Sequence, residues 1–177
     1  RFGDGKEERT KYLVEEAVKG IADYGNILGV PTVAGEVKFD AVYNQNPLVN
    51  AMCIGLVEHD GIYNGVADGV GTTILYAGST TGRDGIHGAS FSSKEVSDEN
   101  KDQGSAVQAG DPFKEKRLID ATVEMMNVYR DDVIGIQDMG AAGHVSSSAE
   151  MAEKAGRGMT LNAAFVPQRE PGLTAYE

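Results

Sequence analysis

The segment from Gly78 to Ser90 combines closely spaced glycines with two side chains suited to an anionic ligand. Four glycines fall within eleven residues, and Arg83 and His87 lie among them. The backbone N–H groups of such a loop can approach a ligand closely, and a guanidinium binds phosphate through parallel hydrogen bonds. The segment indicates a site for a phosphate-bearing small molecule, although it is neither a P-loop nor a GxGxxG fingerprint. A tight loop with a solvated Arg83–Asp84 pair explains the same residues equally well.

Asp138 is the second candidate, because it follows the short apolar run 133–136 and precedes a Gly/Ala turn. Carboxylates at the ends of strands in α/β folds often face the ligand crevice. Mg²⁺ is usually held by one or two carboxylates together with phosphate oxygens and waters. Asp138 is therefore either a magnesium ligand or a turn cap that accepts the N–H of Gly140 or Ala141.

The remaining polar residues carry weaker signals. Gln108 can read a substrate amide because its side chain both donates and accepts, but a surface glutamine has the same type. His59 and His144 have no Cys or His partner at zinc-ligand spacing. No nucleophile-elbow Gly-x-Ser-x-Gly accompanies a Ser-His-Asp set. Spacing alone supports a phosphate-ligand α/β domain without a named reaction.

Three helices are predicted to position these residues. The first spans about Glu7–Tyr24 and ends at Gly25-Asn26, since Gly and Asn are typical of helix C-termini. The second begins at Asp111-Pro112, where Asp is a favourable N-cap and Pro suits the first helical position. The third is capped by Ser146–Ser148 and ends at Gly156.

Apolar and β-branched runs predict strands between the helices. The run 48–57 is apolar on both faces, which is typical of a strand buried on both sides. From residue 72 onwards the predicted order is strand, helix, strand, helix, strand, so the fold class is mixed α/β or α+β. The predicted strands are 32–39, 48–57, 72–77, 133–136 and 159–166.

Composition limits the class of partner. The chain has 177 residues, with 27 Asp and Glu against 16 Lys and Arg, and a net charge of −11. Neither a nucleic acid nor an anionic membrane surface offers counter-charge to such a chain, so neither is expected as a partner. The single cysteine, Cys53, favours a reducing, cytoplasmic setting. The first residue is Arg1 rather than Met, and we expect an internal fragment of a longer protein.

Seven motifs spread over the whole chain match one known family in its own order. They are Thr32–Glu36, Asn46–Cys53, Gly82–Ala89, Val107–Phe113, Gly135–Gly143, Ser146–Met151 and Val166–Glu170. In this combination the chain resembles the small, multi-subunit type of phosphoribosylformylglycinamidine synthase. Each motif alone is weak, and the set is specific.

The resemblance implies an α+β (mixed α/β) fold made from a repeated pair of domains, a barrel-forming α/β half and an adjoining α+β domain. Residues 1–60 would be the C-terminal part of the first barrel-forming half-domain. Residues 61–177 would be the adjoining α+β domain of the aminoimidazole-ribonucleotide-synthase-like superfamily. The later repeat would lie outside this chain, so we expect the isolated fragment to be inactive.

The resembled family converts formylglycinamide ribonucleotide, ATP and ammonia from glutamine into formylglycinamidine ribonucleotide, ADP and phosphate. By resemblance, Gln108 contacts the ribonucleotide, Arg83 and His87 are further substrate-binding candidates, and Asp138 binds Mg²⁺. The family's catalytic His has no match here. A glutaminase subunit and a small accessory subunit are the implied protein partners.

Two other functions stay open at the level of sequence. Another ATP-dependent enzyme of the same superfamily, such as aminoimidazole ribonucleotide synthase, would share the domain pair. A non-catalytic ligand-binding or assembly domain is the other alternative, and the charged segment 94–104 would suit the docking of neighbouring subunits.

Overall fold

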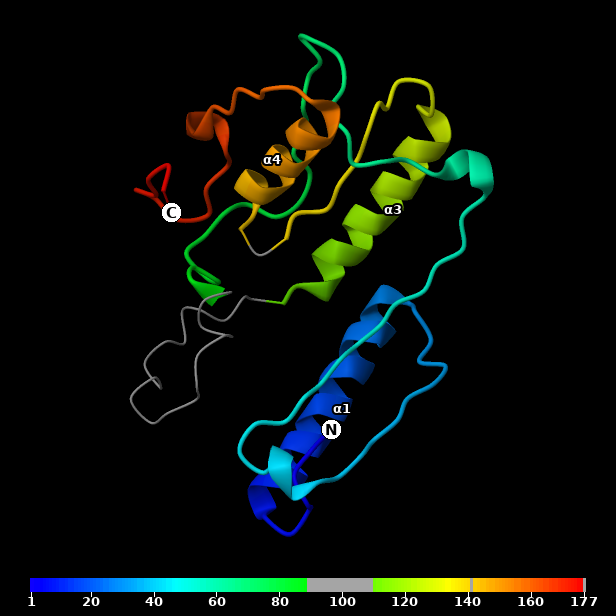
Figure 1. The fold of residues 1–177 in the computed structure, drawn as a ribbon, viewed down its shortest axis with the longest axis vertical. Helices are drawn as coiled ribbons and strands as arrows, with labels where there is room; N and C mark the ends of the chain where they lie inside the picture. The colour runs from blue at the N-terminus through cyan, green and yellow to red at the C-terminus, as the bar shows by residue number, and fades with distance from the viewer. Residues whose placement is uncertain (89–109, 141, 177) are drawn as a thin grey trace. The chain divides into compact units, whose positions relative to one another are not determined.

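The computed structural model describes residues 1–88, 110–140 and 142–176 (Figure 1). The chain divides into two compact units, Arg1–Leu56 and Val57–Glu177. Gln108 and the charged segment 94–104, both singled out in the sequence, lie outside the described residues. The assignment of 1–60 and 61–177 to two named domains stays a prediction.

The first unit is built on helix α1, Glu8–Leu28, which is longer than predicted. The helix does not end at Gly25-Asn26 but runs on to Gly29, which has a φ of 72°. The N–H of Gly29 donates to the Asn26 oxygen at 3.2 Å, and that of Val30 to the Gly25 oxygen at 2.9 Å. A glycine inside a helix costs only about 1 kcal/mol, so the left-handed glycine determines the end.

The strands predicted at 32–39 and 48–57 are not formed as ladders. In the first unit Phe2 and Phe39 make one isolated parallel bridge, and the Leu48 N–H donates to the Arg1 oxygen at 2.9 Å. Between them lies the short 3-10 helix η1, Ala41–Tyr43, capped by Asp40. Segments become strands only where their backbone groups pair along their length. Here the pairing is confined to one end of each segment.

Two of the helix predictions concern the second unit (Figure 1). Helix α3, Pro112–Val128, begins as predicted, because the Asp111 side chain accepts the Lys114 N–H at 3.0 Å. Helix α4, His144–Ala155, ends at Gly156 as predicted but begins before Ser146–Ser148. Gly143, with a φ of 61°, already makes the turn into the helix. The hydroxyl of Ser146 donates back to the Gly143 oxygen at 2.9 Å instead of capping a later start.

The strand predictions in the second unit are also wrong, because the predicted segments form no β ladder. Residues 72–77 and 133–136 have no regular structure, and the run 159–166 contains the 3-10 helix η5, Ala163–Phe165. The Asn162 side chain caps η5 by accepting the Ala164 N–H at 3.2 Å, which turns the chain out of an extended course. A further 3-10 helix, η2, spans His59–Gly61. Thr81 and Gln168 form an isolated bridge in this unit, so the regular structure of the described residues is helical and the β contacts are few.

The buried part of the second unit lies along α4. Ser147, Ser148 and Ala152 are buried, and the Tyr76 hydroxyl lies 2.7 Å from that of Ser148. The Ala67 N–H donates to the Met151 oxygen at 3.1 Å. Helix α4 is therefore the support against which the preceding loops are held.

None of the helices in the described ranges has the length and apolarity needed to cross a bilayer.

Candidate functional site

The segment that leads to Asp138 is held by direct backbone contact. The Ile136 N–H donates to the Asn64 oxygen at 3.2 Å. A Cβ at Gly135 would lie 2.2 Å from the Val66 oxygen and 2.8 Å from the Asn64 oxygen, so only glycine fits. The run 133–138 is thus fixed against 64–66 without a β ladder.

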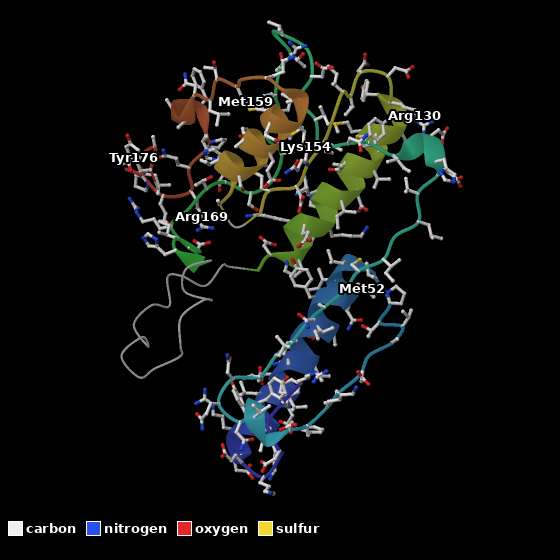
Figure 2. The ribbon with its side chains drawn as sticks, viewed as in Figure 1. Met52, Arg130, Lys154, Met159, Arg169 and Tyr176 are labelled. Atoms are coloured by element: carbon white, nitrogen blue, oxygen red, sulfur yellow. The ribbon has the colours of Figure 1, made fainter. Side chains whose placement is uncertain are left out.

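Helix α4 holds the residue just before Asp138. The Gln137 side-chain amide donates to Glu150 at 2.5 Å, and Lys154 donates to the Gln137 oxygen at 3.2 Å. A single amide that donates and accepts at once is fixed in its orientation. Figure 2 labels Lys154 on α4. These contacts set the direction in which the chain enters Asp138.

Asp138 itself is exposed and unengaged. Within the ranges that the structure describes, no hydrogen bond or ion pair involves its carboxylate. The turn after it is closed instead by the Gly143 N–H, which donates to the Gly140 oxygen at 2.9 Å. A cap on Gly140 is therefore not the role of Asp138, and Ala141 lies outside the described residues. The carboxylate is available to a cation.

The surroundings of Asp138 determine which cation site fits. Among described residues, three or more His, Cys, Asp or Glu side chains nowhere gather into a metal-binding group. A closed site made by protein ligands alone is thus not built by those residues. Mg²⁺ needs fewer protein ligands, since one or two carboxylates suffice when phosphates and waters complete the octahedron. Asp138 fits Mg²⁺ as a single protein ligand.

The described part of the glycine-rich segment, residues 78–88, forms a tight loop. Gly78, Gly85 and His87 have φ values of 150°, 88° and 60°, and His87 is the non-glycine residue with positive φ in the described chain. Hydrogen bonds from Ile86 to the Arg83 oxygen and from Gly88 to the Gly85 oxygen close its turns. A side chain held in the left-handed region costs free energy and often marks a functional site. His87 is exposed, as is Asp84 in the same loop.

Arg83 and Asp84 both pair with the segment 167–172. The Arg83 guanidinium donates to Glu170 at 3.1 Å and to the Gly172 oxygen at 3.3 Å. Asp84 accepts a hydrogen bond from Arg169. The backbone N–H of Arg83, followed by its guanidinium, holds the pKa of the Glu170 carboxyl below its ordinary value. These pairs bridge two segments, unlike the solvated neighbour pair considered from the sequence.

The structure thus groups the predicted site residues only in part. Arg83 and His87 share one loop, whereas in the described chain no hydrogen bond or ion pair links that loop to Asp138. Arg169 and Glu170 were not predicted as site residues. Their motif, Val166–Glu170, was visible in the sequence, but nothing local indicated that it pairs with Arg83 and Asp84.

Comparison with known protein families shows which family the chain resembles. Residues 1–57 match the N-terminal domain of AIR synthase related protein, and residues 69–177 match its C-terminal domain. No solved structure matches the chain. The second match alone covers more than half of the sequence, and the two domains follow in the family's order. The chain therefore belongs to the AIR synthase related family of ATP-using, synthetase-type enzymes.

Proposed function

We propose that this chain is part of a phosphoribosylformylglycinamidine synthase, an ATP-dependent enzyme of purine biosynthesis that forms a C–N bond. Family membership supplies the ATP-using class, and the seven motifs point to this member of it. The observation that carries the proposal is the unengaged Asp138 carboxylate at the end of an anchored segment. Such a carboxylate is what a magnesium–phosphate site requires from the protein.

The proposed reaction has two steps. The amide oxygen of formylglycinamide ribonucleotide attacks the γ-phosphorus of ATP, the bond to the bridging oxygen breaks, and ADP departs. The amide nitrogen loses its proton in the same step, which gives an iminophosphate. Ammonia then adds to the imidate carbon, and phosphate departs with the original amide oxygen to give the amidine. Both steps require positioning and stabilisation of phosphate charge more than covalent work by the protein.

Each candidate residue has a separate role in this proposal. Asp138 would hold Mg²⁺, which neutralises charge on phosphate oxygens when it is bound. The loop of Arg83 and His87 lines the ribonucleotide, and Gln108 donates to and accepts from it. The partners are a glutaminase subunit that supplies ammonia and a small accessory subunit, in the cytoplasm.

A second function is favoured by the family description itself. The matching domains are named after AIR synthase. Such an enzyme would share the domain pair and the use of ATP but would form a different product from its own ribonucleotide. The two functions differ in the substrate consumed. The protein that contains this chain should therefore be supplied with ATP and either ribonucleotide, and the product identified.

Asp138→Asn tests the proposed site. The variant removes the charge without changing the shape, and we expect kcat/KM for amidine formation to fall about 100-fold or more. Excess Mg²⁺ should restore part of the loss. Because the carboxylate has no partner in the described chain, the free energy of unfolding measured in urea should stay within about 0.5 kcal/mol of the parent value.

Asp131→Asn is the matched control, since Asp131 is also exposed and belongs to the same unit. It should leave both activity and magnesium dependence unchanged. Full activity in Asp138→Asn would remove the magnesium role. Turnover of the AIR synthase substrate instead, with a different product, would select the AIR synthase alternative. Turnover of neither substrate by a folded protein would favour a binding or assembly domain.

A further inference from the structure

Four charged side chains form two crossed pairs between the glycine-rich loop and the segment 167–172. Arg83 pairs with Glu170 at 3.1 Å, and Arg169 pairs with Asp84. Arg169 also lies 3.6 Å from Glu170, so the two pairs are connected. We refer to Arg83, Asp84, Arg169 and Glu170 as the clasp. Figure 2 labels Arg169 beside the green loop.

The backbone joins the same two segments. Thr81 and Gln168 form the parallel bridge, with the Thr81 N–H donating to the Pro167 oxygen at 2.9 Å. The Arg169 N–H in turn donates to the Thr81 oxygen at 2.7 Å. The Arg83 N–H donates to Glu170 at 3.1 Å. The clasp is therefore anchored by main-chain as well as side-chain bonds.

Gly82 allows this arrangement. A Cβ at Gly82 would lie 2.1 Å from a guanidinium nitrogen of Arg169 and 3.0 Å from a carboxylate oxygen of Glu170. The absence of a side chain lets both groups lie directly against the loop backbone. The loop glycine therefore has a second role besides flexibility, which is to admit the charged partners.

The charges of the clasp cancel, because two guanidinium groups face two carboxylates. If these two arginines served only to bind phosphate, they would not be paired with carboxylates of the protein. The clasp instead orients a loop in which His87 is held in a costly backbone conformation. Conformations of this kind persist only where surrounding contacts enforce them.

We propose that Glu170 and Arg169 are positioning residues, which fix the substrate-facing loop by holding Arg83 and Asp84. They act on the ribonucleotide through the loop and do not touch the reacting atoms. The inference about substrate rests on the proposed function. The inference about the loop rests on the contacts alone.

Amide hydrogen exchange in the full chain tests the loop directly. We expect Glu170→Ala to speed exchange of the 82–88 amides at least about tenfold, while the amides of α3 are unaffected. Glu170→Gln, which still accepts the Arg83 N–H, should have a smaller effect. Glu153→Gln is the control, because Glu153 is an exposed carboxylate on α4. Unchanged loop protection in Glu170→Ala, or equal acceleration in α3, overturns the proposal.

A double-mutant cycle separates positioning from general destabilisation. If Arg83 and Glu170 act as one unit, Arg83→Ala in the Glu170→Ala background should add little further exchange. If the two substitutions instead multiply their effects on the exchange rate, the residues act independently, and the proposal of the clasp is overturned. Arg83→Lys keeps the charge but loses the planar fork, so it should restore only part of the protection.

Kinetics in the protein that contains this chain supply the second readout. With formylglycinamide ribonucleotide varied, Glu170→Gln should raise KM about tenfold and change kcat less than threefold, as expected for a loop that orients substrate. A loss confined to kcat contradicts the positioning role. If parent protein shows no turnover but the exchange results hold, the proposed function fails and the clasp stands.

Discussion

His87 adopts a backbone conformation that few residues other than glycine tolerate, with a φ of 60° in the loop held by the clasp. In the left-handed region the Cβ lies too close to the following carbonyl oxygen. An imidazole is kept at this position despite that cost. The backbone therefore singles out His87 in the loop independently of any sequence motif.

Two substitutions at His87 separate the side chain from the backbone. Both His87→Gly and His87→Ala remove the imidazole, but only glycine relieves the strain. We expect His87→Gly to be more stable than His87→Ala by about 0.5–1 kcal/mol in urea unfolding, after allowing for the greater freedom of glycine in the unfolded chain. The same pair at Glu153, inside α4, should have the opposite sign. A more stable alanine at position 87 would contradict the strain.

At this scale the sequence predicted residue types better than partners. It identified Arg83, His87 and Asp138 from their neighbours along the chain. It did not predict that Glu170 holds Arg83, because that contact joins residues 87 positions apart and leaves no periodic signal. The lack of a partner for the Asp138 carboxylate among the described residues was likewise visible only in three dimensions.

Among the elements, the contact between 64–66 and 133–138 positions Asp138 together with the bonds from α4 to Gln137. Gly135→Ala would place a methyl group 2.2 Å from the Val66 oxygen, and backbone atoms cannot swing aside as a side chain can. We expect a loss of about 3 kcal/mol in urea unfolding, together with lower activity. Gly158→Ala is the control, since a Cβ there meets nothing within 4 Å. Equal stability of the two variants would contradict the close approach.

Helices were predicted more successfully than strands because their signals are local. Asp111 and Pro112 act within one turn, and the start of α3 follows from them. The end of α1 was missed because Gly25 and Gly29 are equivalent in the sequence, and only Gly29 takes the left-handed conformation. The five strands depended on distant partners. In the described chain those partners supply isolated bridges at Phe2 and Thr81, which no local apolar run could reveal.

For the molecule as a whole, acidity is the dominant charge property, and part of it is tied to folded contacts. Hydrogen bonds lower the pKa values of five carboxyls from ordinary values of 3.8 for Asp and 4.5 for Glu; these are Asp4, Asp60, Asp68, Asp111 and Glu170. A group whose pKa is lower in the folded state stabilises the fold above its unfolded pKa. That contribution is lost as the pH falls through the folded value.

We therefore expect the urea midpoint of unfolding to change little from these groups between pH 7 and 5, and to fall as the pH drops below about 4.5. Glu170→Gln should flatten the lower part of this profile, because it removes a carboxyl whose pKa is lowered chiefly by the Arg83 N–H. A midpoint that is constant from pH 5 to 3 would contradict the assignment.

The clasp also has a consequence for the order of folding events. Its bond between Arg83 and Glu170 closes about half of the chain into one loop, and helices α3 and α4 lie inside that loop. A contact this distant in sequence stabilises the chain only after the entropy cost of closing the loop has been met. The two helices, in contrast, form from local hydrogen bonds. The clasp therefore belongs to the last stage of folding. Removing the clasp should therefore raise the unfolding rate of this unit and leave its folding rate almost unchanged.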